Sequence, residues 1–208
     1  LHLSIRRQRQ MCIRDRSSAH PFGTDKLGRD LLSRVIFGTR TSLIMTLCLV
    51  AVIFVIGTFL GVIAGYFGGI VDGVIMRIAD MMISFPGLVL AIAIAGMLGP
   101  NLVNAVISIA AVSWTKYARL ARSMVLRVKK NLYIEAAVLN GTRTWKILLV
   151  HVLPNMVTQM VVTAAADIGT MMLELASLSF LGFGATAPTP EWGLMLNEGR
   201  TYMAKAPW

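Results

Sequence analysis

The stretch EAAVLNGTRTWKILLVHVLPN, residues 135–155, decides the fold that we expect of this chain. Residues 133–140 favour a helix, Gly141 permits a turn, and residues 142–152 favour a second short helix. Pro154 then marks the start of the apolar segment that follows. Because this stretch lies between apolar segments, it predicts a compact helical element on one surface of a membrane, within an all-α protein.

The composition of the chain excludes an ordinary soluble fold. Of the 208 residues, 56% are hydrophobic and only 14% are charged, whereas soluble domains carry about 25% charged residues. The twenty Lys and Arg residues gather in blocks beside apolar runs, a pattern typical of membrane topology rather than of nucleic-acid binding. Two cysteines, Cys12 and Cys48, provide neither a disulfide framework nor a CxxC metal site.

The apolar runs predict four transmembrane helices. Residues 43–66 are uncharged and long enough to cross a bilayer, which takes about 20 helical residues. The uncharged run 81–115 is broken at residues 99–101 by Gly-Pro-Asn, so it predicts two helices joined by a tight hairpin, the second of which continues past Lys116. Residues 156–178 form the last predicted span, and the whole is a polytopic helical bundle.

Charge decides the expected orientation. Residues 116–146 carry eight cations and one acid, so we place this region in the cytoplasm. Three spans separate it from residues 20–40, which therefore lie outside, and this arrangement calls for a further helix before Leu1.

Within residues 20–40, apolar residues at helical spacing predict a separate helix along the membrane interface, capped by Thr24 or Asp25. Residues 1–19 have no signal-peptide pattern and form an unassigned basic tail.

The spacing of Glu135-Ala136-Ala137, Gly141 and Leu153-Pro154-Asn155 resembles the EAA loop of binding-protein-dependent ABC importer permeases. The ending His-x-Leu-Pro-Asn is similar to the branch of that family that carries dipeptides, oligopeptides and nickel. Further similar stretches are HPFGTDKLGRD at 20–30, AGYFGG at 64–69, SFLGFG at 179–184 and PTPEWG at 188–193. The resemblance covers residues 20–208, which we assign to one permease domain with its coupling loop at about 132–155.

The resemblance implies a six-helix permease, of which four helices are present and the first and last are missing. Its expected partners are a second permease subunit, two ATPase subunits, an extracytoplasmic solute-binding protein and the lipid bilayer of the cytoplasmic membrane. ATP and Mg would bind to the ATPase subunits, so this chain would hold no cofactor and would not itself be an enzyme. The residues expected to dock on the ATPase are Glu135, Ala136, Ala137, Gly141, Leu153 and Pro154.

Two acids in the last predicted span are candidates for the translocation pathway. Asp167 and Glu174 are seven residues apart and share a helix face, and acids inside a membrane are costly unless they face protein or water. A polar contact between helices is an equal alternative. No residues are assigned to catalysis or to metal binding, and we expect His151 to pack or to hydrogen-bond rather than to bind nickel. Arg77 and Asp80 are expected to make pairing or topology contacts.

The function that follows is import of dipeptides or oligopeptides by ATP-driven alternating access, with nickel import as the alternative. A membrane-embedded enzyme is the competing class, and it would need a catalytic constellation such as HExxH, GxSxG or paired histidines. The sequence contains none of these motifs. A nucleic-acid-binding protein is excluded by the apolar spans.

Overall fold

The computed structural model describes residues 16, 18 and 20–202 of the chain, so most of the unassigned tail, residues 1–19, lies outside the described residues. Within the described part, the secondary structure is helical apart from one isolated β-bridge between Thr24 and Asp30. The expected all-α class is therefore confirmed.

The helices follow one another with short connections. Their bounds are α2 Leu31–Phe67, α3 Gly69–Ile83, α4 Gly87–Leu98, α5 Leu102–Val128, α6 Leu132–Leu139, α7 Thr144–Lys146, the π-helical segment η1 Ile147–Val152, α8 Leu153–Phe180, α9 Trp192–Gly199 and the 3-10 turn η2 Arg200–Tyr202.

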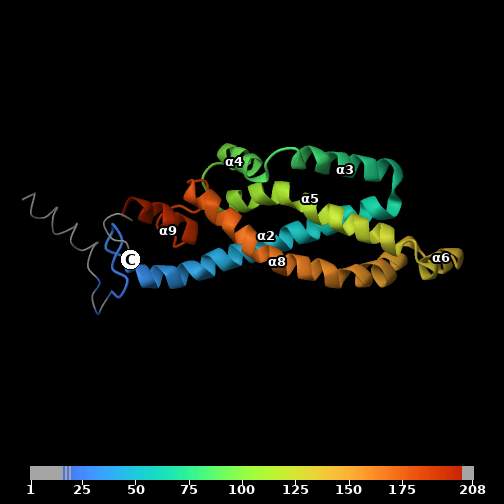
Figure 1. Cartoon of the computed structure of the whole chain (residues 1–208), viewed down its shortest axis with the longest axis horizontal. Coiled ribbons are helices and arrows are strands. Elements are labelled where there is room, and N and C mark those ends of the chain that lie inside the picture. The colour runs from blue at the N-terminus through green and yellow to red at the C-terminus, as the bar shows by residue number, and fades with distance from the viewer. Residues whose placement is uncertain (1–15, 17, 19, 203–208) are drawn as a thin grey trace, which may run out of the picture.

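Three long helices, α2, α5 and α8, form an elongated bundle (Figure 1). The helices α3 and α4 run along the side of α5 and bring the chain back from the α6 end of the bundle toward the α9 end. The short helix α6 lies at one end, whereas α9 and residues 20–30 lie at the opposite end. The cationic residues that precede α2 and those around α6 thus lie at opposite ends of the bundle.

A stripe of glycines brings α2 and α5 into close contact. A Cβ atom at Gly57 would lie 2.5 Å from the carbonyl oxygen of Trp114, and one at Gly61 would lie 2.2 Å from the carbonyl oxygen of Ala118. Gly65 lies one turn further along, against Val125. Small residues at four-residue spacing let membrane helices approach until their backbones touch. This stripe fixes how α2 packs on α5.

The first helix differs from the prediction of a separate interfacial helix followed by a span. Helix α2 is continuous for 37 residues, and its N-cap is Asp30, whose carboxylate accepts a hydrogen bond from the backbone N–H of Ser33 at 2.8 Å. Neither Thr24 nor Asp25 caps it. No proline interrupts the helix, and its glycines are tolerated because they pack against α5 and α9. The prediction of a separate interfacial helix was therefore wrong.

The predicted span over residues 81–98 is broken. Helix α3 ends at Ile83 and α4 begins at Gly87, with an angle of 91° between them. Pro86 has no N–H and disfavours helical geometry at the preceding Phe85, so the helix cannot pass through this point. The second predicted break, at residues 99–101, is confirmed.

Fewer helices qualify as membrane spans than the four we predicted. By length and composition, Leu31–Phe67 and Thr144–Phe180 qualify among the described residues, and the bent pair α3–α4 is a third if it crosses as one broken span. Helix α5 does not meet this criterion, and its second half carries four cations. It nevertheless packs along α2 and α8, so it occupies the same depth as these helices.

The second short helix of the loop also differs from the prediction. Instead of ending at Val152, the helix that starts at Thr144 runs without a break through Pro154 to Phe180. The π-helical turn η1 lies directly before Pro154, and the N–H of Leu153 bonds to the carbonyl of Leu148, five residues earlier. A wider turn here accommodates a proline that an ordinary helix interior would reject. The loop is therefore rigidly joined to α8.

Candidate functional site

The short helix α6 presents most of its surface to the outside of the chain. It carries the predicted docking residues Glu135, Ala136 and Ala137, of which the first two are exposed and the third is half-buried. Gly141 adopts a positive φ of 70° directly after the helix. Its N–H bonds to the carbonyl of Val138, and the next N–H bonds to the carbonyl of Ala137, which is the hydrogen-bond pattern of a Schellman cap.

The other two predicted docking residues belong to a different element. Leu153, which is half-buried, and Pro154, which is exposed, lie in the first turn of α8. Helix α6 reaches this part of the chain by packing on η1, where the rings of Tyr133 and His151 have centroids 6.2 Å apart. His151 thus makes a packing contact, as we expected.

Large apolar side chains surround the docking residues, and the sequence alone did not lead us to single them out. Leu139 is 87% exposed and Leu132 is 81% exposed. An apolar patch of this kind on a compact element marks a surface that contacts another protein or a membrane. The other large exposed apolar residues of this loop are Tyr133, Val138, Trp145, Leu149 and Val150.

The two predicted pathway acids occupy different environments on α8. Asp167 is buried against α5, where one carboxylate oxygen accepts a hydrogen bond from Lys116 Nζ at 2.6 Å and the other from Tyr117 Oη at 2.9 Å. Glu174 lies two turns further along and is half-buried. Asp167 therefore links α5 to α8, and the acceptor atoms it offers are used within the chain.

Two ion pairs hold helix α3 to α5. Arg122 forms a bidentate pair with Asp72, with distances of 2.5 and 2.6 Å, and Arg119 pairs with Asp80. Paired planar groups of this kind combine charge with directional hydrogen bonds. The pairing expected for Asp80 is confirmed.

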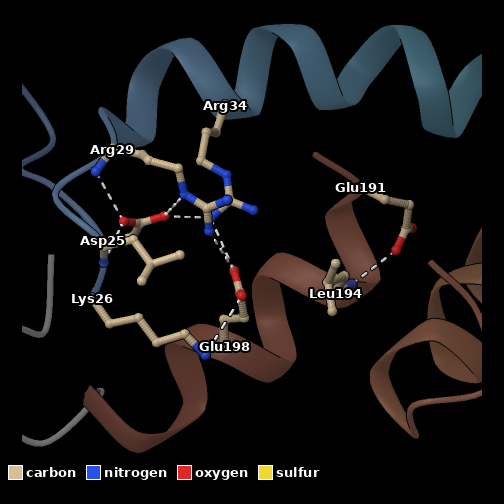
Figure 2. Close-up of polar contacts among 8 residues, drawn as sticks. Asp25, Lys26, Arg29, Arg34, Glu191, Leu194 and Glu198 are labelled. Carbon is tan, nitrogen blue, oxygen red and sulfur yellow. Dashed lines mark hydrogen bonds and ion pairs between the residues drawn. The ribbon is translucent and has the colours of Figure 1, made fainter. Parts of the chain in front are cut away.

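At the end opposite α6, residues 22–34 are tied to α9 by a cluster of five charged side chains (Figure 2). Arg34 donates to Asp25 at 2.6 Å and to Glu198 at 2.9 Å, although the two acids are far apart in the sequence. Arg29 donates to Asp25 at 2.7 Å, and Lys26 lies 3.6 Å from Glu198. Beside the cluster is a cavity of about 270 Å³ with mostly apolar walls.

Asp25 is the centre of this cluster. Burial alone would raise the pKa of its carboxyl, but hydrogen bonds from the backbone and guanidinium of Arg29 and from the backbone N–H of Leu27 outweigh that effect, so the pKa lies below its usual value. The charged form of Asp25 is thus favoured by folding. The buried Arg34 of α2 is compensated by Asp25 together with Glu198 of α9.

These features can now be compared with known proteins. The model of the family described as "binding-protein-dependent transport system inner membrane component" matches residues 57–206, from the middle of α2 to beyond α9. The chain belongs to this family. The permease is accordingly a multi-pass protein of the cytoplasmic membrane.

Relatives assign the permease to the subfamily of ABC-transporter permeases for dipeptides, oligopeptides and nickel. It is 45% identical over 192 residues to the dipeptide transport system permease protein DppC of Alkalihalophilus pseudofirmus, covering 92% of this chain and 63% of the relative. It is 47% identical over 191 residues to the glutathione transport system permease protein GsiD of Pectobacterium atrosepticum, covering 92% and 64%. The nickel transport system permease protein NikC of Escherichia coli is 40% identical over 188 residues, covering 90% and 68%.

The permease chain thus spans less than two thirds of the length of the dipeptide and glutathione relatives. Among the residues that the structure describes, no group of three or more His, Cys, Asp or Glu side chains is placed to hold a metal ion. The residues matched by the family include the α6 loop, the polar contact between α5 and α8, and α9, which packs on α8.

Proposed function

We propose that this chain is a permease subunit of an ABC importer that carries dipeptides or oligopeptides across the cytoplasmic membrane. In this proposal, ATP-driven movement of partner ATPases switches the helices between an inward-open and an outward-open arrangement. The partners are a second permease subunit, two ATPase subunits and an extracytoplasmic solute-binding protein. ATP and Mg bind to the ATPase subunits, and this chain contributes no catalytic residue.

The α6 loop is the observation that carries the proposal. It places a compact, apolar and exposed surface at one end of the bundle, and the helix that follows it runs without a break from Thr144 to Phe180. A displacement of α6 is passed to α8 through η1, because α6 packs on η1 and η1 is continuous with α8. Glu135 and Gly141 lie on the exposed surface that an ATPase would contact.

The polar contact between α5 and α8 is compatible with a peptide as the cargo. Lys116 contributes an exposed ammonium group beside Asp167, and Glu174 lies further along the same helix as Asp167. A peptide carries a carboxylate that such an ammonium group attracts. We assign Asp167 and Glu174 to the translocation pathway on this basis, and nickel remains the alternative cargo.

The test measures coupling in the complete reconstituted transporter after Glu135→Lys or Gly141→Leu. The first change reverses a charge on the docking surface, and the second places a side chain at a positive φ, which costs about 1–2 kcal/mol locally. We expect both variants to assemble and to lose transport and substrate-stimulated ATP hydrolysis together.

Glu135→Gln is the matched control for the charge, since it keeps the shape of the side chain. It should lose less coupling than Glu135→Lys. Unchanged transport and unchanged ATP hydrolysis in both Glu135→Lys and Gly141→Leu would overturn the docking assignment. If the solute-binding protein of the same transporter retains nickel but no peptide, the cargo is nickel and not a peptide.

A further inference from the structure

Polar side chains form a continuous stripe along α8. They recur at intervals of three or four residues, which places them on one face of a helix. The stripe consists of Gln159, Thr163, Asp167, Thr170, Glu174 and Ser177. The hydroxyl groups of Thr163, Thr170 and Ser177 bond to carbonyls of α8 itself, so they make the stripe wettable without needing a partner helix.

Lys116 of α5 lies beside this stripe, along the length of the bundle rather than at its α6 end. It is fourteen positions after Leu102, which is about 21 Å along the helix. Its partner Asp167 is thirteen positions before Phe180, which is about 20 Å along α8. Lys116 and Asp167 therefore lie at the same level when each is measured from the same end of the bundle. This level of about 20 Å is within the thickness of a hydrocarbon core, which is about 30 Å.

The exposure of Lys116 at this level favours protein or water, rather than lipid, on its face of the bundle. The side chain is 58% exposed within this chain, whereas that of Asp167 is 6% exposed. A charged group facing hydrocarbon at this level is costly, so such residues face protein or a water-filled path. An ammonium has three N–H donors, of which Asp167 takes one. Lys116 is therefore able to bind a second acceptor.

Asp167 does not depend on Lys116 alone. The hydroxyl of Tyr117, which is buried, donates to its other carboxylate oxygen. If Lys116 turns partly toward another anion, Asp167 keeps this hydrogen bond and is not left as an unsatisfied buried charge. The arrangement lets Lys116 exchange partners, while Tyr117 holds Asp167 in place.

We propose that Lys116 and Glu174 form a binding subsite for the two charged ends of a short peptide, with the peptide carboxylate on Lys116 and its ammonium group on Glu174. This inference rests on the proposed function and extends it by naming the residues that recognise the cargo. Asp167 positions Lys116 and does not itself contact the peptide.

The spacing of the subsite favours peptides of about three residues. Glu174 is seven positions, or about 10.5 Å, further along α8 than Asp167, which marks the level of Lys116. An extended chain covers about 3.3–3.6 Å per residue, so three residues span about 10–11 Å.

The experiment uses a cysteine reporter within the stripe of the complete transporter. Thr170→Cys, in a background with Cys12→Ser and Cys48→Ser, places one thiol between Asp167 and Glu174. Its labelling by a charged, water-soluble thiol reagent is measured with trialanine or trialanine amide present, in the absence of the solute-binding protein. Val161→Cys is the control, because Val161 is also exposed but lies on the opposite face of α8.

We expect Thr170→Cys to be labelled and Val161→Cys to resist labelling. Trialanine should slow the labelling at a concentration about ten- to a hundredfold lower than trialanine amide does, since a charge-assisted hydrogen bond contributes about 1.5–3 kcal/mol and 1.4 kcal/mol is a factor of ten. Adding Lys116→Met should abolish this difference between the two peptides. A purely structural role of Lys116 would not alter the preference for a free carboxylate.

Three results would overturn the inference: resistance of Thr170→Cys to the reagent, equal protection by both peptides, or a preference that survives Lys116→Met. Uptake of trialanine with the solute-binding protein present, measured on the same preparations, separates this inference from the proposed function. If uptake persists while protection is absent, only the subsite is wrong. If trialanine is neither taken up nor protective, peptide import is wrong as well.

Discussion

The contact between α2 and α5 predicts that Gly61→Ala destabilises the permease although alanine is the better helix former. The added Cβ would lie 2.2 Å from the carbonyl oxygen of Ala118 and 2.7 Å from the Cβ of Ala121. An ordinary van der Waals contact begins at 3.4 Å, so the helices must separate locally by about 1.2 Å, from 2.2 to 3.4 Å. The nearest atom belongs to the backbone, which cannot turn aside as a side chain can.

The matched control is Gly73→Ala in α3, where an added Cβ has no atom within 4 Å. Both substitutions remove a helical glycine, so both gain about 0.8–1 kcal/mol of helix propensity. The difference between the two variants isolates the overpacking, which costs about 1–3 kcal/mol. For a chain of this size, each kcal/mol shifts Tm by about 2–4 °C. We therefore expect Gly61→Ala to unfold about 2–12 °C below Gly73→Ala.

The assay is thermal unfolding of the purified chain in detergent, followed by circular dichroism at 222 nm. Gly57→Ala should behave like Gly61→Ala, because its Cβ would lie 2.5 Å from the carbonyl oxygen of Trp114. Equal Tm values for Gly61→Ala and Gly73→Ala would refute the packing of α2 on α5 through the glycine stripe.

Three further predictions concern other parts of the molecule. Because folding lowers the pKa of Asp25, its carboxylate contributes to stability above about pH 4, and this contribution is lost as the pH falls further. The difference in Tm between wild type and Asp25→Asn should therefore shrink between pH 6 and pH 3. Asp72→Asn leaves Arg122 without its bidentate partner and should lower the free energy of unfolding by about 1–3 kcal/mol, measured in a denaturant titration. An unchanged free energy of unfolding would contradict a role of this ion pair in holding α3. The side chain of Trp145 is 58% exposed, so Trp145→Ala should change Tm by less than about 2 °C. The same variant should bind purified ATPase subunits more weakly, and binding equal to that of wild type would exclude Trp145 from the docking surface.

The features predicted from the sequence are those that local chemistry decides. Uncharged runs and the turn at residues 99–101 were sufficient for the all-α bundle, and the fixed spacing of Glu135 and Gly141 identified the loop. The break at Pro86 was missed because it lies inside an uncharged run, although proline was its visible signal. The glycine stripe of α2 was also visible, as three glycines at intervals of four residues.

Other features depend on contacts between distant residues and have no local signal. Arg34 and Glu198 are separated by 164 positions, and nothing in either neighbourhood indicates that they meet. The pairing of Lys116 with Asp167 likewise requires the packing of α5 on α8, which a single sequence does not reveal. The continuity of Thr144–Phe180 was missed because Pro154 ordinarily starts a helix, whereas here a π-helical turn accommodates it inside one.

Site-specific photo-cross-linking tests most directly the central claim that α6 is the surface driven by an ATPase. A photoreactive amino acid is placed at Leu139 or at Met97, which are 87% and 88% exposed. Leu139 belongs to α6, at one end of the bundle, and Met97 to α4, which lies well away from α6. In the assembled complex, we expect a cross-link to the ATPase subunit from Leu139 and none from Met97. A cross-link to the ATPase from Met97, with none from Leu139, would contradict both the docking surface and the orientation of the permease in the membrane.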